Sequence, residues 1–220
     1  MNRKQLLTGL VVLAVIAIGV VAYMVFSEPT NDNASLTSGG TKYAVTLSSY
    51  DRTLGNPKAP ITIVEYAAPT CPHCAHFEMT LFPFIKTNYI DTGKVYYVFR
   101  VFPLSQVDVA AESMARCLPA ENYFQFIDLL FRNQPKWDPD GYQIPDVHAA
   151  LVDMGRIAGM SADQVDKCIS DQDAQKRATD VGLFAQKTQN VNGTPPFPVN
   201  GDIAPPFEST DDIKKYLDAV

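Results

Sequence analysis

The sequence predicts an α/β fold with a helical insertion, and an N-terminal transmembrane anchor or signal in front of it. Three observations predict this. A mostly apolar, β-branched run leads into a close pair of cysteines, and a helical pattern and a second strand-like run follow the pair. A long stretch with helical periodicity comes next, before a short strand and a final helix. The N-terminal segment is almost wholly apolar. Strand, helix and strand in this order are typical of a right-handed parallel unit, which the helical stretch interrupts.

The N-terminal apolar run covers residues 6–26, LLTGLVVLAVIAIGVVAYMVF. At about 1.5 Å of rise per residue, a helix of this length crosses the roughly 30 Å hydrocarbon core of a bilayer. Arg3 and Lys4 precede the run, so the positive-inside rule keeps the N-terminus in the cytoplasm and exports the rest. The run is longer than a usual signal h-region, and no A-x-A-like site follows it. We favour an uncleaved anchor over residues 1–27 at the periplasmic face of the membrane, with a cleaved signal and a soluble periplasmic protein as the alternative.

The rest of the chain divides into a linker and one domain. Residues 28–44 are rich in Ser, Thr, Asn and Gly and show no periodicity, which predicts a flexible linker. Residues 45–220 form the predicted domain, with the helical insertion at about 105–190. The formal charge is −6 and the pI about 5.0, and Lys and Arg are not clustered. Nucleic-acid binding is therefore not expected, because it needs clustered basic residues.

The first half of the domain contains two clear strand signals. The run ITIVEYA, Ile61–Ala67, predicts a buried strand, and KVYYVFRVF, Lys94–Phe102, predicts a second one parallel to it. The segment Leu54–Pro60 has the composition of a turn. Apolar residues recur at helical spacing from Cys74 to Tyr89, and Pro83 inside that pattern predicts a kink.

The second half is predicted to be mainly helical. Prolines and glycines separate the helical segments. A short strand and turn are expected at Pro196–Gly201, followed by a C-terminal helix capped by Ser209 or Thr210. The helices of the insertion are expected near residues 107–117, 121–133, 146–158, 162–170 and 174–188.

The close cysteine pair, Cys71 and Cys74, falls where a strand gives way to a helix. Helix N-termini carry unpaired N–H groups and a partial positive charge, which stabilise a thiolate. Pro72 suits the first turn, and His73 adds a candidate cation beside the sulfur. Each effect lowers the pKa of Cys71 and stabilises the reduced form, which makes the disulfide a strong oxidant. Cys74, one turn further in, is expected to be the more buried, resolving thiol.

The pair has two other interpretations, a zinc site and a structural crosslink. A zinc site needs a second ligand pair, whereas Cys117 and Cys168 are single and far apart, so no metal is expected. A purely structural Cys71–Cys74 disulfide would close too short a loop to restrict the unfolded chain much.

Four cysteines allow three connectivities, and one of them keeps the close pair together. It combines Cys71–Cys74 with Cys117–Cys168. Because export favours disulfides, the second pair is predicted to form a structural disulfide that clamps the insertion. The alternative is two buried free thiols.

Glu65 is the unusual residue of the first strand, because a charge in a buried strand is costly. It precedes Cys71 by six residues and is placed to lie beneath the pair, where it would take up or relay the proton of Cys74. The alternative is a strand-edge residue that faces water.

Together these features resemble the DsbA-like branch of the thioredoxin superfamily. The similar elements are a strand with Glu, then C-P-H-C opening a helix, a helical insertion, and G-T-P before a strand ending V-N-G, over about residues 50–220. The resemblance implies a thioredoxin-like fold, with Cys71 as nucleophile, Cys74 as its resolving partner and Glu65 as the buried acid. Glu78 also matches an acidic position of the family.

The resemblance further implies a cis-proline at Thr194-Pro195, packed against the redox pair, where backbone groups can pair with an extended substrate. Thr194 departs from the family, since the best-known oxidases have Val there and isomerase-type relatives more often have Thr. Pro196 and Pro198 remove ladder donors, so the strand after Pro195 is expected to be short or irregular.

The leading functional hypothesis is a thiol:disulfide oxidase without a cofactor. Its expected substrates are unfolded or reduced exported proteins, and a DsbB-like membrane quinone reductase is expected to reoxidise it. The first alternative is a reductase or isomerase on the same fold, although isomerases usually add a dimerisation domain and residues 27–60 are too few for one. The second is a non-catalytic periplasmic binding or holdase module.

Overall fold

The structure is a computed structural model that describes residues 45–48 and 50–220, together with the backbone of residues 35–36. The chain divides into two units, residues 1–34 and 35–220, and every element below belongs to the second. The predicted anchor and most of the predicted linker lie outside the described residues. Among the residues that are described, no helix is long and apolar enough to span a membrane.

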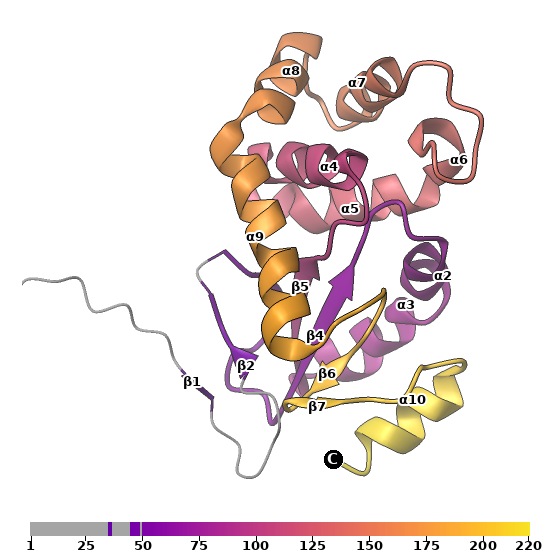
Figure 1. Ribbon diagram of the computed structural model, residues 1–220. Helices are drawn as coiled ribbons and strands as arrows, with labels where there is room; N and C mark the ends of the chain where they lie inside the picture. The colour runs from indigo at the N-terminus through magenta and orange to yellow at the C-terminus, as the bar shows by residue number, and fades with distance from the viewer. Residues whose placement is uncertain (1–34, 37–44, 49) are drawn as a thin grey trace, which may run out of the picture. The chain divides into compact units, whose positions relative to one another are not determined.

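A five-stranded mixed sheet forms the centre of the fold, in the order β3-β5-β4-β6-β7 (Figure 1). The middle strands β4 (Ile61–Ala67) and β5 (Val95–Val101) are parallel and buried along their whole length. Burial on both faces explains why each reads as a continuous apolar run. Antiparallel strands flank them: β3 (Arg52–Gly55), β6 (Pro198–Val199) and β7 (Asp202–Ile203). The two predicted strands and their parallel pairing are confirmed.

The helix that follows the cysteine pair is interrupted. It begins at Pro72, as the proline in the first turn predicts, and consists of α2 (Pro72–Thr80), α3 (Phe82–Ile85) and one π-helical turn (Lys86–Ile90). The break between α2 and α3 falls at Leu81, near Pro83, whose ring and missing N–H cannot continue a regular helix. The apolar side chains of this segment cover the face of the sheet that carries Ile63 and Tyr97.

The helical insertion lies at one end of the sheet, and α9 runs from it back along the sheet (Figure 1). The five predicted helices are confirmed to within about two residues at each end, apart from a 3-10 turn at the start of α5. The short helix α6 was missed because Pro135 was interpreted only as a break, although proline is favoured in a first turn. The elements are α4 (Gln106–Cys117), a 3-10 turn (Ala120–Asn122), α5 (Tyr123–Arg132), α6 (Gln134–Trp137), α7 (Val147–Ile157), α8 (Ala162–Ser170) and α9 (Gln172–Gln189).

Short strands account for most of the remaining differences from the sequence expectations. The turn was expected to begin at Leu54, but Leu54 and Gly55 are the last two residues of β3, a four-residue edge strand. Gly55 has a φ of 88°, and the chain leaves the strand there. A two-stranded antiparallel sheet pairs β1 (Ser35–Leu36), inside the predicted linker, with β2 (Val45–Thr46). Strand β6 has only two residues, as its prolines predict. The C-terminal helix α10 (Thr210–Leu217) is capped by Ser209.

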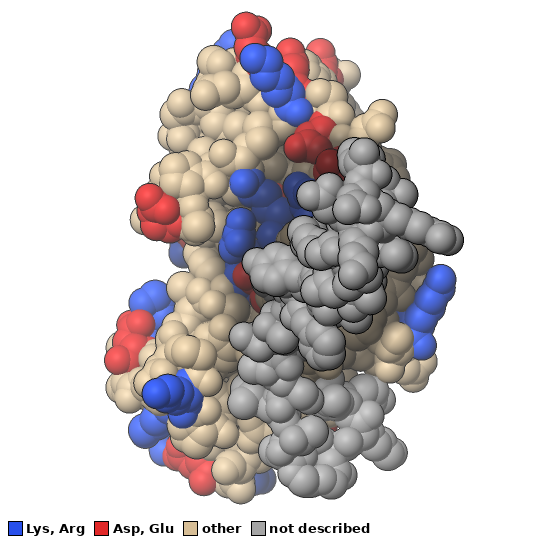
Figure 2. Space-filling model, turned by 90° about the vertical axis from the view of Figure 1, so that its left-hand side faces the viewer, with Lys and Arg blue, Asp and Glu red and all other residues tan. Residues whose placement is uncertain are grey.

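Charge on the molecule is mixed rather than segregated. Figure 2 shows acidic and basic side chains interspersed over one face, with basic ones gathered near its middle. Two arginines are held by buried acids, Arg100 by Asp51 at 2.7 Å and Arg116 by Glu112. That the chain does not bind nucleic acid stays a prediction.

Candidate redox site

The redox pair lies at the start of α2, immediately beyond the C-terminal end of β4. Cys71 is the N-cap of the helix, and its sulfur accepts the backbone N–H of Cys74 at 3.3 Å. Pro72 occupies the first turn, where its missing N–H leaves no donor unpaired. The otherwise unpaired N–H groups of the helix terminus therefore point at the sulfur of Cys71.

The two thiols are not bonded to each other, and their surroundings separate their pKa values. The pKa of Cys71 is lowered to about 6, first by a hydrogen bond from the Cys74 thiol and further by the Thr194 side chain and by backbone N–H groups, including that of His73. Burial opposes this lowering. The pKa of Cys74 is raised well above its ordinary value, chiefly by burial. At neutral pH the pair therefore holds a thiolate at Cys71 and a thiol at Cys74.

The side chain of His73 is exposed. The sequence suggested that its ring would act on the sulfur as a cation. In the structure, His73 contributes to the low pKa of Cys71 through its backbone N–H.

The loop after α9 lies across from the pair. The Thr194-Pro195 peptide bond is cis, and in its protonated form the Cys71 thiol donates a weak hydrogen bond to the carbonyl oxygen of Thr194 at 3.6 Å. The carbonyl of Pro196 accepts the N–H of Tyr66 at 3.3 Å, which attaches the loop to β4. The backbone around Thr194 is thereby held beside the nucleophile.

Two carboxyl groups and a phenol are buried next to the pair. Glu65 is 0% exposed, and its side chain accepts the hydroxyl of Tyr97, which also lies 3.3 Å from Glu78. The pKa of Glu65 is raised well above its ordinary value, first by burial and then by the charge of Glu78. Burial also raises the pKa of Glu78 to about 7. The alternative that Glu65 faces water at a strand edge is wrong, because β4 is a central strand.

Glu65 interacts electrostatically with both cysteines. Its charge raises the pKa of Cys74, and the charge of Cys71 in turn raises the pKa of Glu65. One oxygen of Glu65, Oε1, is buried without a hydrogen-bond partner among the described residues. Because an ionised carboxylate is costly in such a place, Glu65 holds a proton more tightly than a surface carboxyl does.

Three residues of the site were not singled out from the sequence. Tyr97 was interpreted only as part of a buried strand, and its hydroxyl reaches Glu65 because of the register in which β4 and β5 pair. Asp108 and Gln134 reach the cysteine loop from the insertion. Asp108 is 38 residues from its partner Thr70, and Gln134 is 65 residues from its partner Pro69, so the sequence gives no signal of either contact. Over the described part of the chain, no group of three or more His, Cys, Asp or Glu side chains is placed to hold a metal ion.

Comparisons with known proteins agree with this geometry. Residues 47–219 match the thioredoxin family. A putative protein-disulfide oxidoreductase of Rickettsia bellii is 36% identical over 161 residues, 73% of this chain and 61% of the relative. The chain thus spans about three fifths of the length of that relative. A probable disulfide bond formation protein D of Bacillus cereus is 27% identical, over 99% of this chain and 97% of its own length.

Solved structures give the same result. The crystal structure of alpha-DsbA1 from Wolbachia pipientis matches with a TM-score of 0.71 and 28% identity, over 79% of this chain and 92% of that one. This chain belongs to the DsbA-like branch of the thioredoxin superfamily. BdbD from Bacillus subtilis, at 23% identity and a TM-score of 0.66 over 77% of this chain and 91% of its own, shares the fold.

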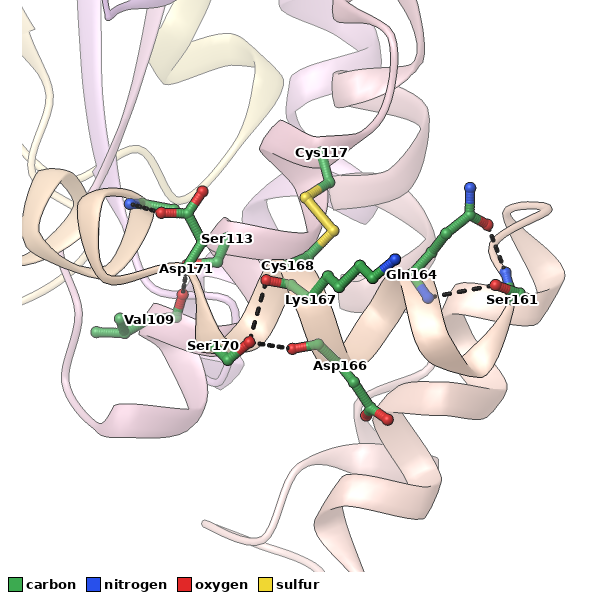
Figure 3. Close-up of a disulfide and its surroundings, with 11 residues drawn as sticks. Val109, Ser113, Cys117, Ser161, Gln164, Asp166, Lys167, Cys168, Ser170 and Asp171 are labelled. Atoms are coloured by element: carbon green, nitrogen blue, oxygen red, sulfur yellow. Dashed lines mark hydrogen bonds between the residues drawn. A yellow bond between two sulfur atoms is a disulfide. The ribbon is translucent and has the colours of Figure 1, made fainter.

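The DsbA-like fold of this chain carries a disulfide away from the redox pair, between Cys117 and Cys168. Figure 3 shows it linking the last residue of α4 to α8, within the insertion. The two cysteines are bonded to each other and are not the two free thiols of the alternative. The bond joins two cysteines that are 51 residues apart in the sequence. It therefore reduces the conformational entropy of the unfolded chain more than a bond that closes a short loop would.

Replacing both of these cysteines by alanine is expected to lower the free energy of unfolding by about 2–4 kcal/mol, because the loop-closure restraint on the unfolded chain is lost. Urea denaturation of the oxidised variant and the oxidised parent measures the difference. Disulfide exchange by Cys71 is expected to persist in the folded variant. An unchanged unfolding free energy would contradict a structural role for the bond.

Proposed function

We propose that this chain is a thiol:disulfide oxidase that donates the Cys71–Cys74 disulfide to reduced exported proteins. The observation that carries the proposal is that the pKa values of the two thiols shift in opposite directions. The Cys74 thiol, the Thr194 side chain and backbone N–H groups of the helix lower the pKa of Cys71 to about 6, whereas burial raises that of Cys74. A reduced form stabilised in this way makes the oxidised form a strong disulfide donor.

The reaction is two successive thiol–disulfide exchanges. A substrate thiolate attacks the sulfur of Cys71, the Cys71–Cys74 bond breaks, and its electron pair passes to Cys74, which takes up a proton. A second substrate thiolate then attacks the substrate sulfur of the mixed disulfide, and Cys71 leaves as a thiolate. The substrate dithiol loses two electrons and its protons, and the cysteine pair gains the electrons.

Glu65 is proposed to supply the proton that Cys74 takes up. Glu65 is fully buried, and its negative charge raises the pKa of the Cys74 thiol. Because like charges repel, protonation of Cys74 favours loss of the proton from Glu65. Tyr97 orients the Glu65 carboxyl through its hydroxyl, and Glu78 lies on the other side of the same phenol.

The loop at Thr194 is proposed to receive the substrate as an extended strand, because its backbone lies beside the Cys71 sulfur. The side chain of Thr194 supports the oxidase direction, since it lowers the pKa of Cys71. The identity of that residue also favours a second candidate, a reductase or isomerase on the same fold. A non-catalytic binding module fits less well, because it would have no use for a lowered pKa at Cys71.

Export and recycling are inferred from the sequence. We infer an extracytoplasmic location, at the periplasmic face of the membrane with residues 1–27 as an anchor or soluble after cleavage. Reoxidation of the pair requires an electron acceptor, and a DsbB-like membrane quinone reductase is the proposed one.

Trapping tests the proposal directly. In a Cys74→Ala variant the mixed disulfide at Cys71 cannot be resolved internally, so we expect covalent adducts with exported proteins, separable by non-reducing electrophoresis and released by a thiol reductant. The double variant Cys71→Ala, Cys74→Ala is the matched control and should form none. Oxidised parent protein that fails to introduce disulfides into a reduced, unfolded secreted protein, together with reduced parent protein that readily reduces the disulfides of folded ones, would instead support the reductase.

A further inference from the structure

The backbone that leads into the nucleophile is held from the helical insertion. The side-chain amide of Gln134, in α6, donates to the carbonyl oxygen of Pro69 at 2.8 Å and to that of Cys71 at 3.0 Å. Gln134 is 4% exposed, so water does not readily replace these bonds. The Cys71 carbonyl also accepts the N–H of Ala75 within α2. Gln134 therefore contacts the carbonyl of the nucleophile itself.

A second helix of the insertion holds the residue between those two carbonyls. The Asp108 carboxylate in α4 accepts the backbone N–H of Thr70 at 2.8 Å and its hydroxyl at 3.1 Å. The same carboxylate also accepts the N–H groups of Leu104 and Ser105. Residues 69–71 are thus fixed from two separate helices of the insertion, α4 and α6.

Gln134 occupies a rigid position. Helix α6 is only four residues long, with Pro135 in its first turn, and it ends at Trp137. Trp137 is 0% exposed and donates its indole N–H to the carbonyl of Leu130 at 2.8 Å. The amide is therefore aimed at the loop by a buried anchor three residues away, so its orientation does not depend on a flexible side chain alone.

We propose that Gln134 is a positioning residue of the redox pair: its amide fixes the carbonyls of Pro69 and Cys71, and so keeps the Cys71 sulfur within reach of the donors that activate it. This inference rests on the proposed function. Those donors include the backbone N–H groups of His73 and Cys74, which reach the sulfur because Cys71 sits at the helix N-cap. When the carbonyls lose their partner, the loop relaxes to pair them with water or other groups, and the sulfur moves relative to the N–H groups.

The test replaces Gln134 by methionine, which has a similar length and no donor. A titration followed by thiolate absorbance should show the pKa of Cys71 raised by about one unit. This corresponds to a roughly tenfold smaller acid dissociation constant. At pH 8 the reduction potential of the pair should fall by the equivalent tenfold, about 30 mV. Gln134→Glu, whose ionised carboxylate cannot donate, should shift both quantities in the same direction and serves if the methionine variant folds poorly.

The matched control is Gln125→Met, the same change at an exposed glutamine of α5 in the same insertion, which should leave both quantities unchanged. The free energy of unfolding of the oxidised forms is measured in parallel. A purely structural role would lower that free energy and leave the thiolate titration and the potential as in the parent, and this result would overturn the inference. A parent protein with a thioredoxin-like potential would contradict the proposed function instead, whatever Gln134→Met does.

Discussion

Replacing Cys71 by serine is expected to reduce disulfide exchange to the rate seen without the protein. A serine hydroxyl cannot form a disulfide, and Cys74, which is 0% exposed with a raised pKa, cannot take over as the attacked sulfur. Oxidative refolding of a reduced, unfolded secreted protein measures the effect, with a thiol count at each time point.

The matched control makes the same serine change at both Cys117 and Cys168, which also removes cysteines but leaves the redox pair intact. That variant should retain exchange while it is folded. Cys74→Ser should still form a mixed disulfide through Cys71 but should not turn over. Retained turnover in Cys71→Ser would show that another sulfur is the nucleophile, and the proposed roles of the two cysteines would be wrong.

The local part of the site was predictable because the chemistry is contained in a short segment. A strand that ends a few residues before C-P-H-C, with proline in the first helical turn, places Cys71 at a helix N-terminus without any knowledge of the rest of the fold. The burial of Glu65 was foreseeable for the same reason, since it stands within a mostly apolar run that predicts a buried strand.

The long-range part of the site was not predictable in the same way. Tyr97 meets Glu65 because two strands pair in a particular register, Ile63 opposite Tyr97 and Glu65 opposite Phe99, and the side chains of alternate residues share a face. That register is a tertiary property. Gln134 reaches the cysteine loop because the chain turns at Asn133, between the end of α5 and the start of α6. That turn is likewise a feature of the folded insertion.

Short elements were also missed, for a physical reason. Strand β3 has only four residues and begins with Arg52, so it carries too little apolar alternation to be distinguished from a turn. It exists because its backbone pairs with β5 along residues 96–99, and not because of its own propensity. The same holds for α6, whose side chains at Gln134 and Trp137 are buried by the surrounding helices.

The reduced form of this DsbA-like chain is expected to owe part of its stability to the Cys71 thiolate. The pKa of Cys71 is lowered on folding from about 9 to about 6. A group with a depressed pKa contributes stability that is fully present above its unfolded value and is lost as the pH falls through its folded value. The contribution is therefore complete above about pH 9 and disappears below about pH 6. The oxidised form has no thiolate and no such contribution.

The reduction potential of the Cys71–Cys74 pair against pH tests the central claim most directly. Equilibration with glutathione buffers from pH 4.5 to 8.5 should give a strongly oxidising pair, nearer to the value of about −120 mV known for DsbA than to about −270 mV for thioredoxin. Because Cys71 is protonated only below about pH 6 and Cys74 throughout, the slope should change there, from about 59 to about 30 mV per pH unit. A potential near −270 mV, with no change of slope near pH 6, would contradict an oxidase driven by a stabilised Cys71 thiolate.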